Sequence, residues 1–138
     1  MDALRSGYLA RRVWLFQLGK FITVGVINTL VDLGVFFLLL QTTELAGNPV
    51  LAKAISYACG ILNSFFWNRA WTFRSRIAIA PGLALFVFAN LGALVVNAGG
   101  MYIGLNVLNL PRIFALTVAT VSTFLLNFVV SKFVIFRS

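Results

Sequence analysis

The residue with the clearest chemical potential is an aspartate inside a long apolar stretch. Asp32 lies about halfway along segment 21–40, where an unpaired carboxylate costs on the order of 2.5–3.5 kcal/mol. Asn28 and Gly25 precede it by four and seven residues, which places all three on one helix face. Three roles are open for Asp32: a proton-coupled switch, a partner for a basic headgroup-binding residue, or a fixed acceptor for neighbouring hydroxyls. Lys53 can pair with it or snorkel outward.

The other apolar segments also carry small and polar residues at helical spacing. Such stripes commonly join membrane helices, because small side chains let backbones approach and polar ones hydrogen-bond across the interface. The same residues can instead line a polar groove for a ligand. The residues of these stripes that we predict as ligand contacts are Asn63 in the second segment, Asn97 in the third and Asn127 in the fourth.

A second cluster combines aromatic and basic residues at the end of the second apolar segment. Residues 68–74 read Asn-Arg-Ala-Trp-Thr-Phe-Arg. Tryptophan and arginine at this place are typical of an anchor at the membrane interface. The alternative is a phosphate site in which Arg69 binds bidentately together with Lys132, its counterpart near the chain end. Both interpretations stay open at this point.

The composition excludes several other kinds of chemistry. The chain has one cysteine and no histidine, which excludes an intrachain disulfide, histidine metal sites and histidine-dependent triads. We therefore predict no metal site, no cofactor and no enzymatic activity. The formal charge is +8, but the basic residues lie between apolar blocks. This pattern favours anionic lipids as partners over nucleic acid.

The elements that must position these residues are predicted to be membrane-spanning helices. Of the 138 residues, 61% are hydrophobic and 10% are charged, too apolar for one fold in water. A spanning helix needs about 20 mainly apolar residues. The alternating pattern of a membrane barrel is missing. We expect an all-α membrane protein with four transmembrane helices at 21–40, 50–67, 83–105 and 113–132. A proline lies near the start of each of the last three.

The loops predict the orientation of these helices. Nine of the 11 basic residues lie in the N-terminal segment, the central loop and the chain end, and only two lie on the opposite side. The positive-inside rule then places both termini on the cytoplasmic side of the cell inner membrane. The segment 1–20 mixes basic and apolar residues, which is typical of an amphipathic segment on the inner surface. A disordered tail is the alternative.

The four-helix domain 21–138 contains an internal repeat. Residues 65–75 align with 128–138, and 21–35 align with 86–100, so that Asp32 matches Asn97. The halves are about 21–75 and 83–138. A repeat of two helices brings in the second copy with the orientation of the first. We therefore expect two tandem, similarly oriented helical hairpins; duplication alone does not establish transport.

Several of these motifs resemble the GtrA-like family. They are Val-Gly-Val-Ile-Asn-Thr-Leu-Val-Asp at 24–32, Ala-Ile-Ser-Tyr at 54–57 with Gly60, the run 64–73, and the degenerate copy 126–136. The resemblance implies a role in cell-surface polysaccharide synthesis. It implies translocation of a polyprenyl-phosphate-linked sugar to the outer leaflet, often beside a membrane glycosyltransferase that makes the lipid-linked donor. By matching position, the residues carried over as functional are Asn28, Asp32, Asn68, Arg69 and Thr72.

A polar groove between the helices would shield such a headgroup while its tail stays in lipid. Four thin helices make a narrow groove, so a homodimer or a partner protein is a reasonable requirement. Two other functions stay open. One is an accessory subunit that anchors a glycosyltransferase without transporting anything, and the other is a small proton-coupled exporter.

Overall fold

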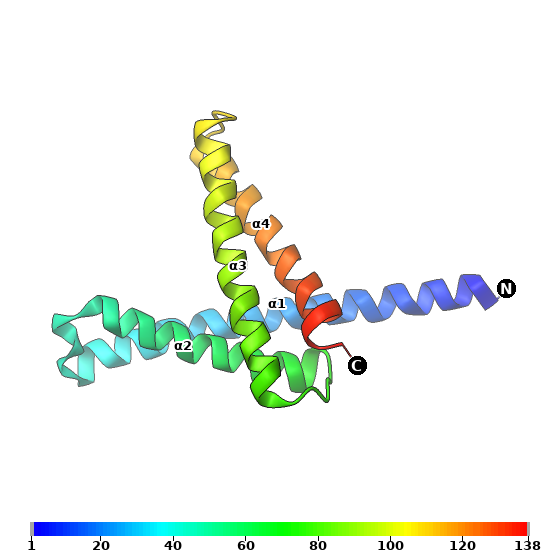
Figure 1. Cartoon of the computed structure of the whole chain (residues 1–138), viewed down its shortest axis with the longest axis horizontal. Helices are drawn as coiled ribbons and strands as arrows, with labels where there is room; N and C mark the ends of the chain where they lie inside the picture. The colour runs from blue at the N-terminus through cyan, green and yellow to red at the C-terminus, as the bar shows by residue number, and fades with distance from the viewer. Residues whose placement is uncertain (1, 138) are drawn as a thin grey trace. The chain divides into compact units, whose positions relative to one another are not determined.

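Every element of regular structure in the part of the chain that the computed structural model describes is helical (Figure 1). The structure describes residues 2–137, except for the side chains of residues 2–8, 10, 45 and 46. The long helices are α1 (Asp2–Thr42), α2 (Pro49–Trp67), α3 (Ile79–Asn106) and α4 (Arg112–Val130). The short ones are the 3₁₀ turn η1 (Glu44–Gly47) and the π-helical turns η2 (Asn68–Thr72) and η3 (Ser131–Ile135).

Four helical stretches are long and apolar enough to cross a membrane. Each exceeds the roughly 20 residues that a spanning helix needs. The four predicted spans are therefore confirmed as helices of spanning length, and their ends extend beyond the predicted ones, most of all at the start of the first, which lies at Arg11 in place of residue 21. The stretches cover Arg11–Thr42, Pro49–Thr72, Ile79–Asn106 and Arg112–Ile135.

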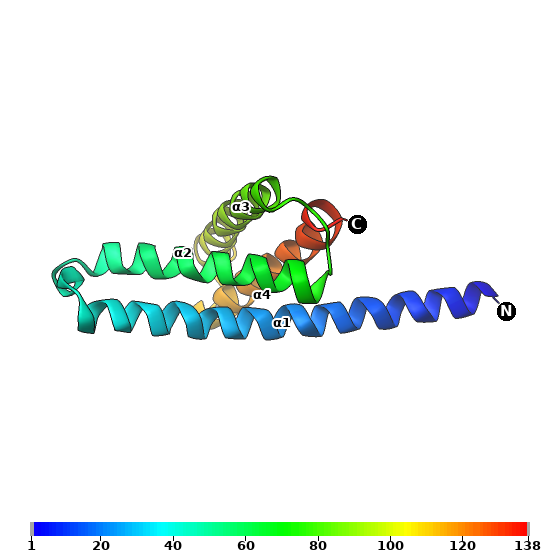
Figure 2. The same cartoon turned by 90° about the horizontal axis from the view of Figure 1, so that it is seen from below.

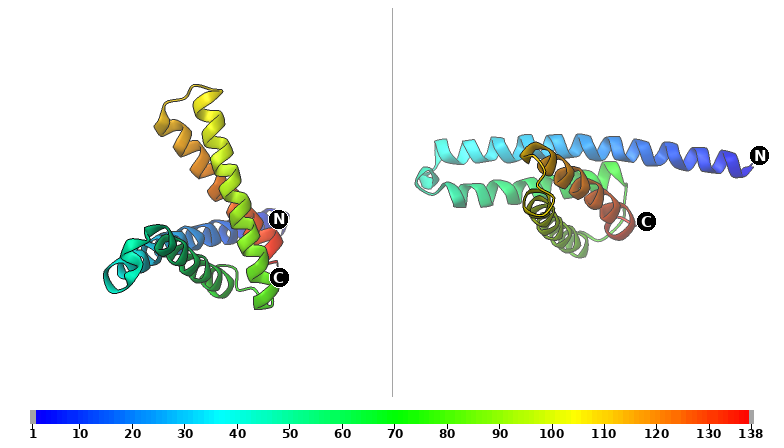
Figure 3. Two further views of the ribbon diagram at one scale, coloured as in Figure 1. Left: turned by 60° about the vertical axis from the view of Figure 1, so that its left-hand side comes forward. Right: turned by 90° about the horizontal axis from the view of Figure 1, so that it is seen from above.

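The chain divides into two compact units, Met1–Arg74 and Ser75–Ser138. In the first unit α1 packs against α2, and in the second α3 packs against α4. Figure 2 shows α1 and α2 side by side, joined by the turn at η1, and Figure 3 shows α3 and α4 joined by their loop. Each unit is thus one helical hairpin, as the repeat predicts.

Prolines set the starts of three helices. At α2, the Asn48 side chain accepts a hydrogen bond from the backbone N–H of Leu51 (3.1 Å), and Pro49 opens the helix. Pro111 precedes α4 directly. Helix α3 begins at Ile79, before the predicted start, and its first turn accommodates Pro81. This is allowed because the first four N–H groups of a helix have no intrahelical partner.

The N-terminal segment is continuous with the first span. Helix α1 runs without a break from Asp2 to Thr42, and its first part extends past the end of α2 (Figure 2). No proline precedes Pro49, and glycine alone lowers helix stability without ending the helix. The predicted boundary at residue 20 therefore falls inside a helix. Its placement on the membrane surface stays a prediction.

Most of the large apolar side chains face outward, as expected when lipid is the solvent. Val95 is 71% exposed and Leu30 is 64% exposed. Burial is confined to narrow seams rich in phenylalanine and alanine. The buried apolar residues are Phe21, Val24, Ala52, Phe65, Phe73, Phe86, Ala93, Ala115, Ala119, Phe128, Ile135 and Phe136.

The repeat also appears in how each hairpin ends. In the first, η2 closes with a hydrogen bond from Phe73 N–H to the Asn68 carbonyl (2.9 Å). In the second, η3 closes with the matching bond from Phe136 N–H to the Ser131 carbonyl (2.8 Å). Each closing phenylalanine packs against the first long helix of its own hairpin. The ring centroids are 6.1 Å apart for Phe21–Phe73 and 5.9 Å apart for Phe86–Phe136.

Candidate functional site

Asp32 is held by two polar groups of the facing helix. Lys53 on α2 forms an ion pair with Asp32 Oδ2 (2.5 Å), and the Ser56 hydroxyl donates to Asp32 Oδ1 (2.6 Å). Of the roles left open by the sequence, the structure shows that of a partner for a basic residue and an acceptor for a hydroxyl. The Lys53 side chain is 49% exposed and that of Asp32 is 17% exposed. The pair is therefore reachable from outside the hairpin.

One turn away, Asn28 lies against a glycine of the facing helix. A Cβ atom added at Gly60 would lie 3.1 Å from Asn28 Oδ1 and 3.5 Å from Asp32 Cβ. The absence of a side chain at Gly60 thus lets the two helices approach at the height of Asn28 and Asp32. Asn28 Oδ1 is buried and has no hydrogen-bond partner among the described residues. Gly25 is predicted on the same face, but a Cβ added there would have no atom of the described residues within 4 Å.

Three further polar residues continue along α2 and η2. Asn63 Nδ2, Asn68 Oδ1 and Thr72 Oγ1 are buried and lack a hydrogen-bond partner in the described part of the chain. Asn68 uses its other amide atom, Nδ2, to donate to the Ser64 hydroxyl (3.2 Å). We define the polar seam as the polar residues on the facing sides of α1, α2 and η2. They are Asn28, Asp32, Lys53, Ser56, Asn63, Asn68 and Thr72.

The polar seam is long enough to cross a bilayer. From Lys53 to Thr72 it covers 19 helical steps, or roughly 28 Å at the usual rise per residue. The hydrocarbon core of a bilayer is about 30 Å thick. A buried polar atom without a partner costs about 1–3 kcal/mol, so packing alone gives no reason for several of them in one hairpin. The arrangement can supply hydrogen bonds to a polar ligand at successive positions along the hairpin.

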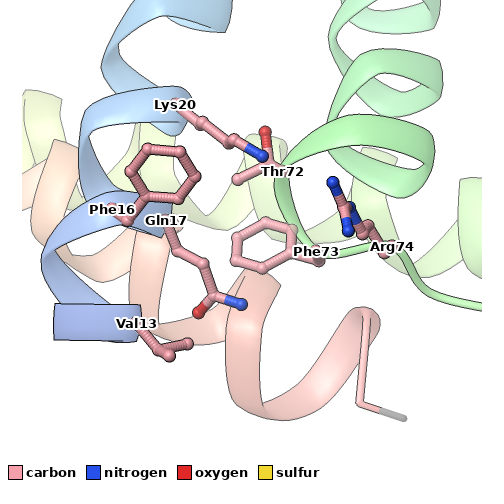
Figure 4. A pocket seen from close by; sticks show the side chains of 7 residues that line it. All are labelled: Val13, Phe16, Gln17, Lys20, Thr72, Phe73 and Arg74. Carbon is pink, nitrogen blue, oxygen red and sulfur yellow. The ribbon is translucent and has the colours of Figure 1, made fainter. Parts of the chain in front are cut away.

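A pocket of about 200 Å³ lies where η2 ends against α1 (Figure 4). The Lys20 ammonium reaches across from α1 and donates to the Trp71 carbonyl (3.2 Å). It also lies over the rings of Phe16 (4.7 Å) and Trp71 (5.0 Å). Lys20 is not among the site residues predicted from the sequence. The predicted Arg69 lies half-buried on η2 and does not line the pocket. The lining residues are Val13, Phe16, Gln17, Lys20, Thr72, Phe73 and Arg74.

In the second hairpin the predicted residues have different surroundings. Asn97 Nδ2 on α3 donates to the Thr123 hydroxyl of α4 (3.3 Å), and Thr123 in turn donates to the Ala119 carbonyl (2.7 Å). Asn127 is half-buried on α4. Lys132 is half-buried on η3, and its ammonium lies 5.6 Å from the centre of the Phe133 ring. The predicted residues Asn97, Asn127 and Lys132 therefore all belong to the second hairpin.

Small residues of the two helices meet closely in the second hairpin. A Cβ added at Gly104 would lie 2.9 Å from Ala115 Cβ, and one at Gly100 would lie 3.5 Å from Ala119 Cβ. This is the helix adhesion that the sequence offered as the alternative to a ligand groove. On α3 it holds for Gly100 and Gly104, and the residues that they meet on α4 are the alanines Ala115 and Ala119. In the first hairpin, Gly60 is the stripe residue with such a contact.

Comparison with known proteins places this fold in a family. The family model described as "GtrA/DPMS, transmembrane domain" matches residues 20–136. The chain belongs to this family. The match spans both hairpins, from the start of the first apolar segment to the end of η3.

A relative is recorded in Bacillus subtilis (strain 168) as "Uncharacterized membrane protein YngA". The two chains are 36% identical over 141 residues, which covers 99% of this chain and 93% of the relative. Together with the four candidate spans, this makes the protein a multi-pass membrane member of the GtrA/DPMS family. The family is linked to cell-surface polysaccharide synthesis.

Proposed function

We propose that this GtrA/DPMS protein translocates a polyprenyl-phosphate-linked sugar across the cytoplasmic membrane. The observation that carries the proposal is the polar seam of the first hairpin. It offers the Asp32–Lys53 pair, the Ser56 hydroxyl and several unpartnered amide and hydroxyl atoms over roughly the thickness of the hydrocarbon core.

A sugar phosphate crosses hydrocarbon only if its hydrogen bonds to water are replaced on the way. Unpartnered atoms such as Asn63 Nδ2 and Asn28 Oδ1 provide donors and acceptors for sugar hydroxyls. The tail needs no such path, because it stays in lipid beside outward-facing apolar residues such as Leu30. The helices therefore only have to shield the headgroup, which fits a thin two-helix seam.

The Asp32–Lys53 pair lies toward the outer end of the seam. Its carboxylate accepts hydrogen bonds and its ammonium donates them, so it can exchange its internal bonds for bonds to hydroxyl and phosphate groups. No covalent bond needs to be made or broken in this process. The protein in this proposal is a transporter, and it has no catalytic residues.

The proposal includes an orientation. Both termini, η2 and η3 face the cytoplasm, because nine of the 11 basic residues lie at these ends. The headgroup then enters beside η2 and leaves near the turn between α1 and α2. Asn97, Asn127 and Lys132 of the second hairpin are further predicted contacts, and anionic lipids surround the basic ends. A homodimer or a membrane glycosyltransferase completes the enclosure.

The direct test is reconstitution of the purified chain in liposomes with a labelled polyprenyl-phosphate sugar. Transfer of the label between leaflets is expected to be faster than in protein-free liposomes. Asp32→Asn is expected to slow it by about tenfold or more, since it removes a charged hydrogen-bonding group of the polar seam. Transfer at the protein-free rate, unaffected by this change, would contradict the proposal. That result would favour the accessory-subunit function.

A proton-coupled exporter is separated from the flippase in the same vesicles. A pH gradient that drives uptake of small solutes, without any transfer of the lipid-linked sugar, would favour the exporter. The lipid-linked flippase requires transfer of the sugar lipid itself, and we expect it without an imposed pH gradient.

A further inference from the structure

The pocket at the inner end of the first hairpin carries positive charge that no acid balances. Lys20 and Arg74 both line it, and the described residues that line it include no carboxylate. The chain has only three acidic residues. The nearest of these to Lys20 along α1 is Asp32, twelve residues or about 18 Å away along the helix axis, and it pairs with Lys53.

The same pocket contains buried polar atoms without partners. Thr72 is 3% exposed, and its hydroxyl has no hydrogen-bond partner among the described residues. Gln17 Oε1 is likewise buried and unpartnered. Lys20 uses one of its three N–H donors on the Trp71 carbonyl. Figure 4 shows Lys20 reaching from α1 toward Thr72 on η2, with Gln17 and Arg74 around the same space.

The second hairpin shows that this polar set is not needed to close the turn. When the alignment of 21–35 with 86–100 is continued four residues upstream, Gln17 and Lys20 correspond to Gly82 and Leu85, and Thr72 corresponds to Ile135 in the alignment of 65–75 with 128–138. That hairpin nevertheless forms the same π-helical turn and the same phenylalanine pair. Only the arginine is shared, as Arg74 and Arg137. The polar lining therefore has a reason other than the fold of the turn.

We propose that this pocket binds the phosphate group of a phosphate ester. Lys20 and Arg74 supply the charge, the Thr72 hydroxyl donates a hydrogen bond to a phosphate oxygen, and the amide of Gln17 contacts a neighbouring hydroxyl of the ligand. The apolar lining, Val13, Phe16 and Phe73, contacts the hydrocarbon of a lipid ester. This assigns phosphate recognition to Lys20 and Arg74 in place of the Arg69–Lys132 pair that the sequence suggested.

One consequence rests on the proposed function. If the ester is the lipid-linked sugar, the pocket is its loading site on the cytoplasmic side, at the inner end of the polar seam. Thr72 then belongs to both, since it lines the pocket and forms the inner end of the seam.

Equilibrium binding to the full chain in nanodiscs of neutral phosphatidylcholine tests the site. The probes are a polyprenyl phosphate and the polyprenol of the same length, which lacks the phosphate. We expect the phosphate to bind at least about tenfold more tightly than the alcohol, because charge-assisted hydrogen bonds are the strong ones. Equal binding of the two probes would overturn the proposal.

Three variants and a matched control locate the binding. Arg74 has a φ of 51°, a conformation that asparagine tolerates, so Arg74→Asn removes the charge without straining the turn. We expect Arg74→Asn and Lys20→Met to weaken phosphate binding about tenfold or more, and Thr72→Val to weaken it several-fold. Arg137→Asn, the same change at the exposed counterpart, is expected to leave it within twofold. Equal losses for Arg74→Asn and Arg137→Asn would overturn the site, since they would show attraction by net charge alone.

Competition separates the sources of the phosphate. Displacement of the probe by inorganic phosphate would support a site for soluble phosphate esters, and displacement only by phosphatidylglycerol or polyprenyl phosphate would support a lipid site. Asp32→Asn separates this proposal from the proposed function. We expect it to slow leaflet transfer and to leave phosphate binding intact. Normal binding in all three pocket variants, with transfer still present, would contradict the phosphate site and would leave the proposed transport function standing.

Discussion

The two hairpins share the same arrangement of helices and closing turn, which we call the frame, and differ in the polar side chains between their helices. Both end in a π-helical turn closed by a phenylalanine that packs on the first long helix of the same hairpin. Both bury a phenylalanine and an alanine at matching places along their second helix, Phe65 and Phe128, and Ala52 and Ala115. The duplicated sequence thus specifies the same local packing twice.

The polar contents of the hairpins are different. At matching positions the first has Asp32, Lys53 and Ser56, and the second has Asn97, Leu116 and Ala119. All five buried polar atoms without a partner among the described residues belong to the first hairpin. Because each costs about 1–3 kcal/mol, the first hairpin carries groups that the frame does not need. This difference is the reason why we propose that a polar ligand binds to the first hairpin.

The largest expected effect on stability comes from separating the charges of the first hairpin. Lys53→Leu gives the first hairpin the residue that the second has at this position, but it leaves the Asp32 carboxylate without its cation. We expect a loss of about 2 kcal/mol in the free energy of unfolding, somewhat below the cost of an unpaired carboxylate because Ser56 still donates to it. Thermal unfolding in detergent micelles measures it.

A second variant replaces both residues of the Asp32–Lys53 pair by their counterparts in the second hairpin. Asp32→Asn with Lys53→Leu copies Asn97 and Leu116 of the second hairpin. We expect this double variant to unfold within about 1 kcal/mol of the unmodified chain, since replacing both members of a pair removes the unpaired charge. A double variant as unstable as Lys53→Leu would show that the hairpins are not equivalent in their packing.

The next effect concerns the contacts of small residues in the second hairpin. A methyl group at Gly104 would lie 2.9 Å from Ala115 Cβ and 3.3 Å from its Cα, which is backbone. Gly104→Ala therefore forces the helices apart, and we expect a loss of about 1–2 kcal/mol. Gly100→Ala is the matched control, because its methyl would make ordinary contact at 3.5 Å. Equal unfolding midpoints for the two variants would contradict this packing.

The smallest effect tests the shared frame itself. Phe73→Leu and Phe136→Leu each remove one ring from a pair of tilted rings, 54° and 52° between planes. We expect each to cost about 1 kcal/mol and the two costs to agree within about half of that. Unfolding in bicelles is the measurement. A clearly larger cost in one hairpin would mean that the turns are not equivalent.

Much of the frame could be predicted from the sequence because it follows from the hydropathy of the segments and from the prolines between them. The length of each apolar segment indicated four spans, and the prolines near residues 49, 81 and 111 indicated three helix starts. The Asp32–Lys53 pair was foreseen as one of two options for Lys53. The structure shows it formed, because Lys53 lies on the face of α2 toward Asp32.

The pocket and the π-helical turns were not foreseen. Lys20 and Thr72 are 52 residues apart in the chain, and no local pattern tells that α1 passes beside η2. One signal was available in the repeat. Lys20 and Thr72 are polar where their counterparts Leu85 and Ile135 are apolar. Helix α1 runs through residue 20, where the change from a basic to an apolar sequence led us to divide the chain.

The role of the polar seam is tested by comparing leaflet transfer by the unmodified chain with transfer by the double variant Asp32→Asn with Lys53→Leu. The variant keeps the frame and gives the first hairpin the Asn97 and Leu116 of the second. With a labelled polyprenyl-phosphate sugar in liposomes, we expect a folded variant whose transfer is slower by about tenfold or more. Transfer at the full rate in this folded variant would contradict the claim that the polar seam of the first hairpin carries the headgroup.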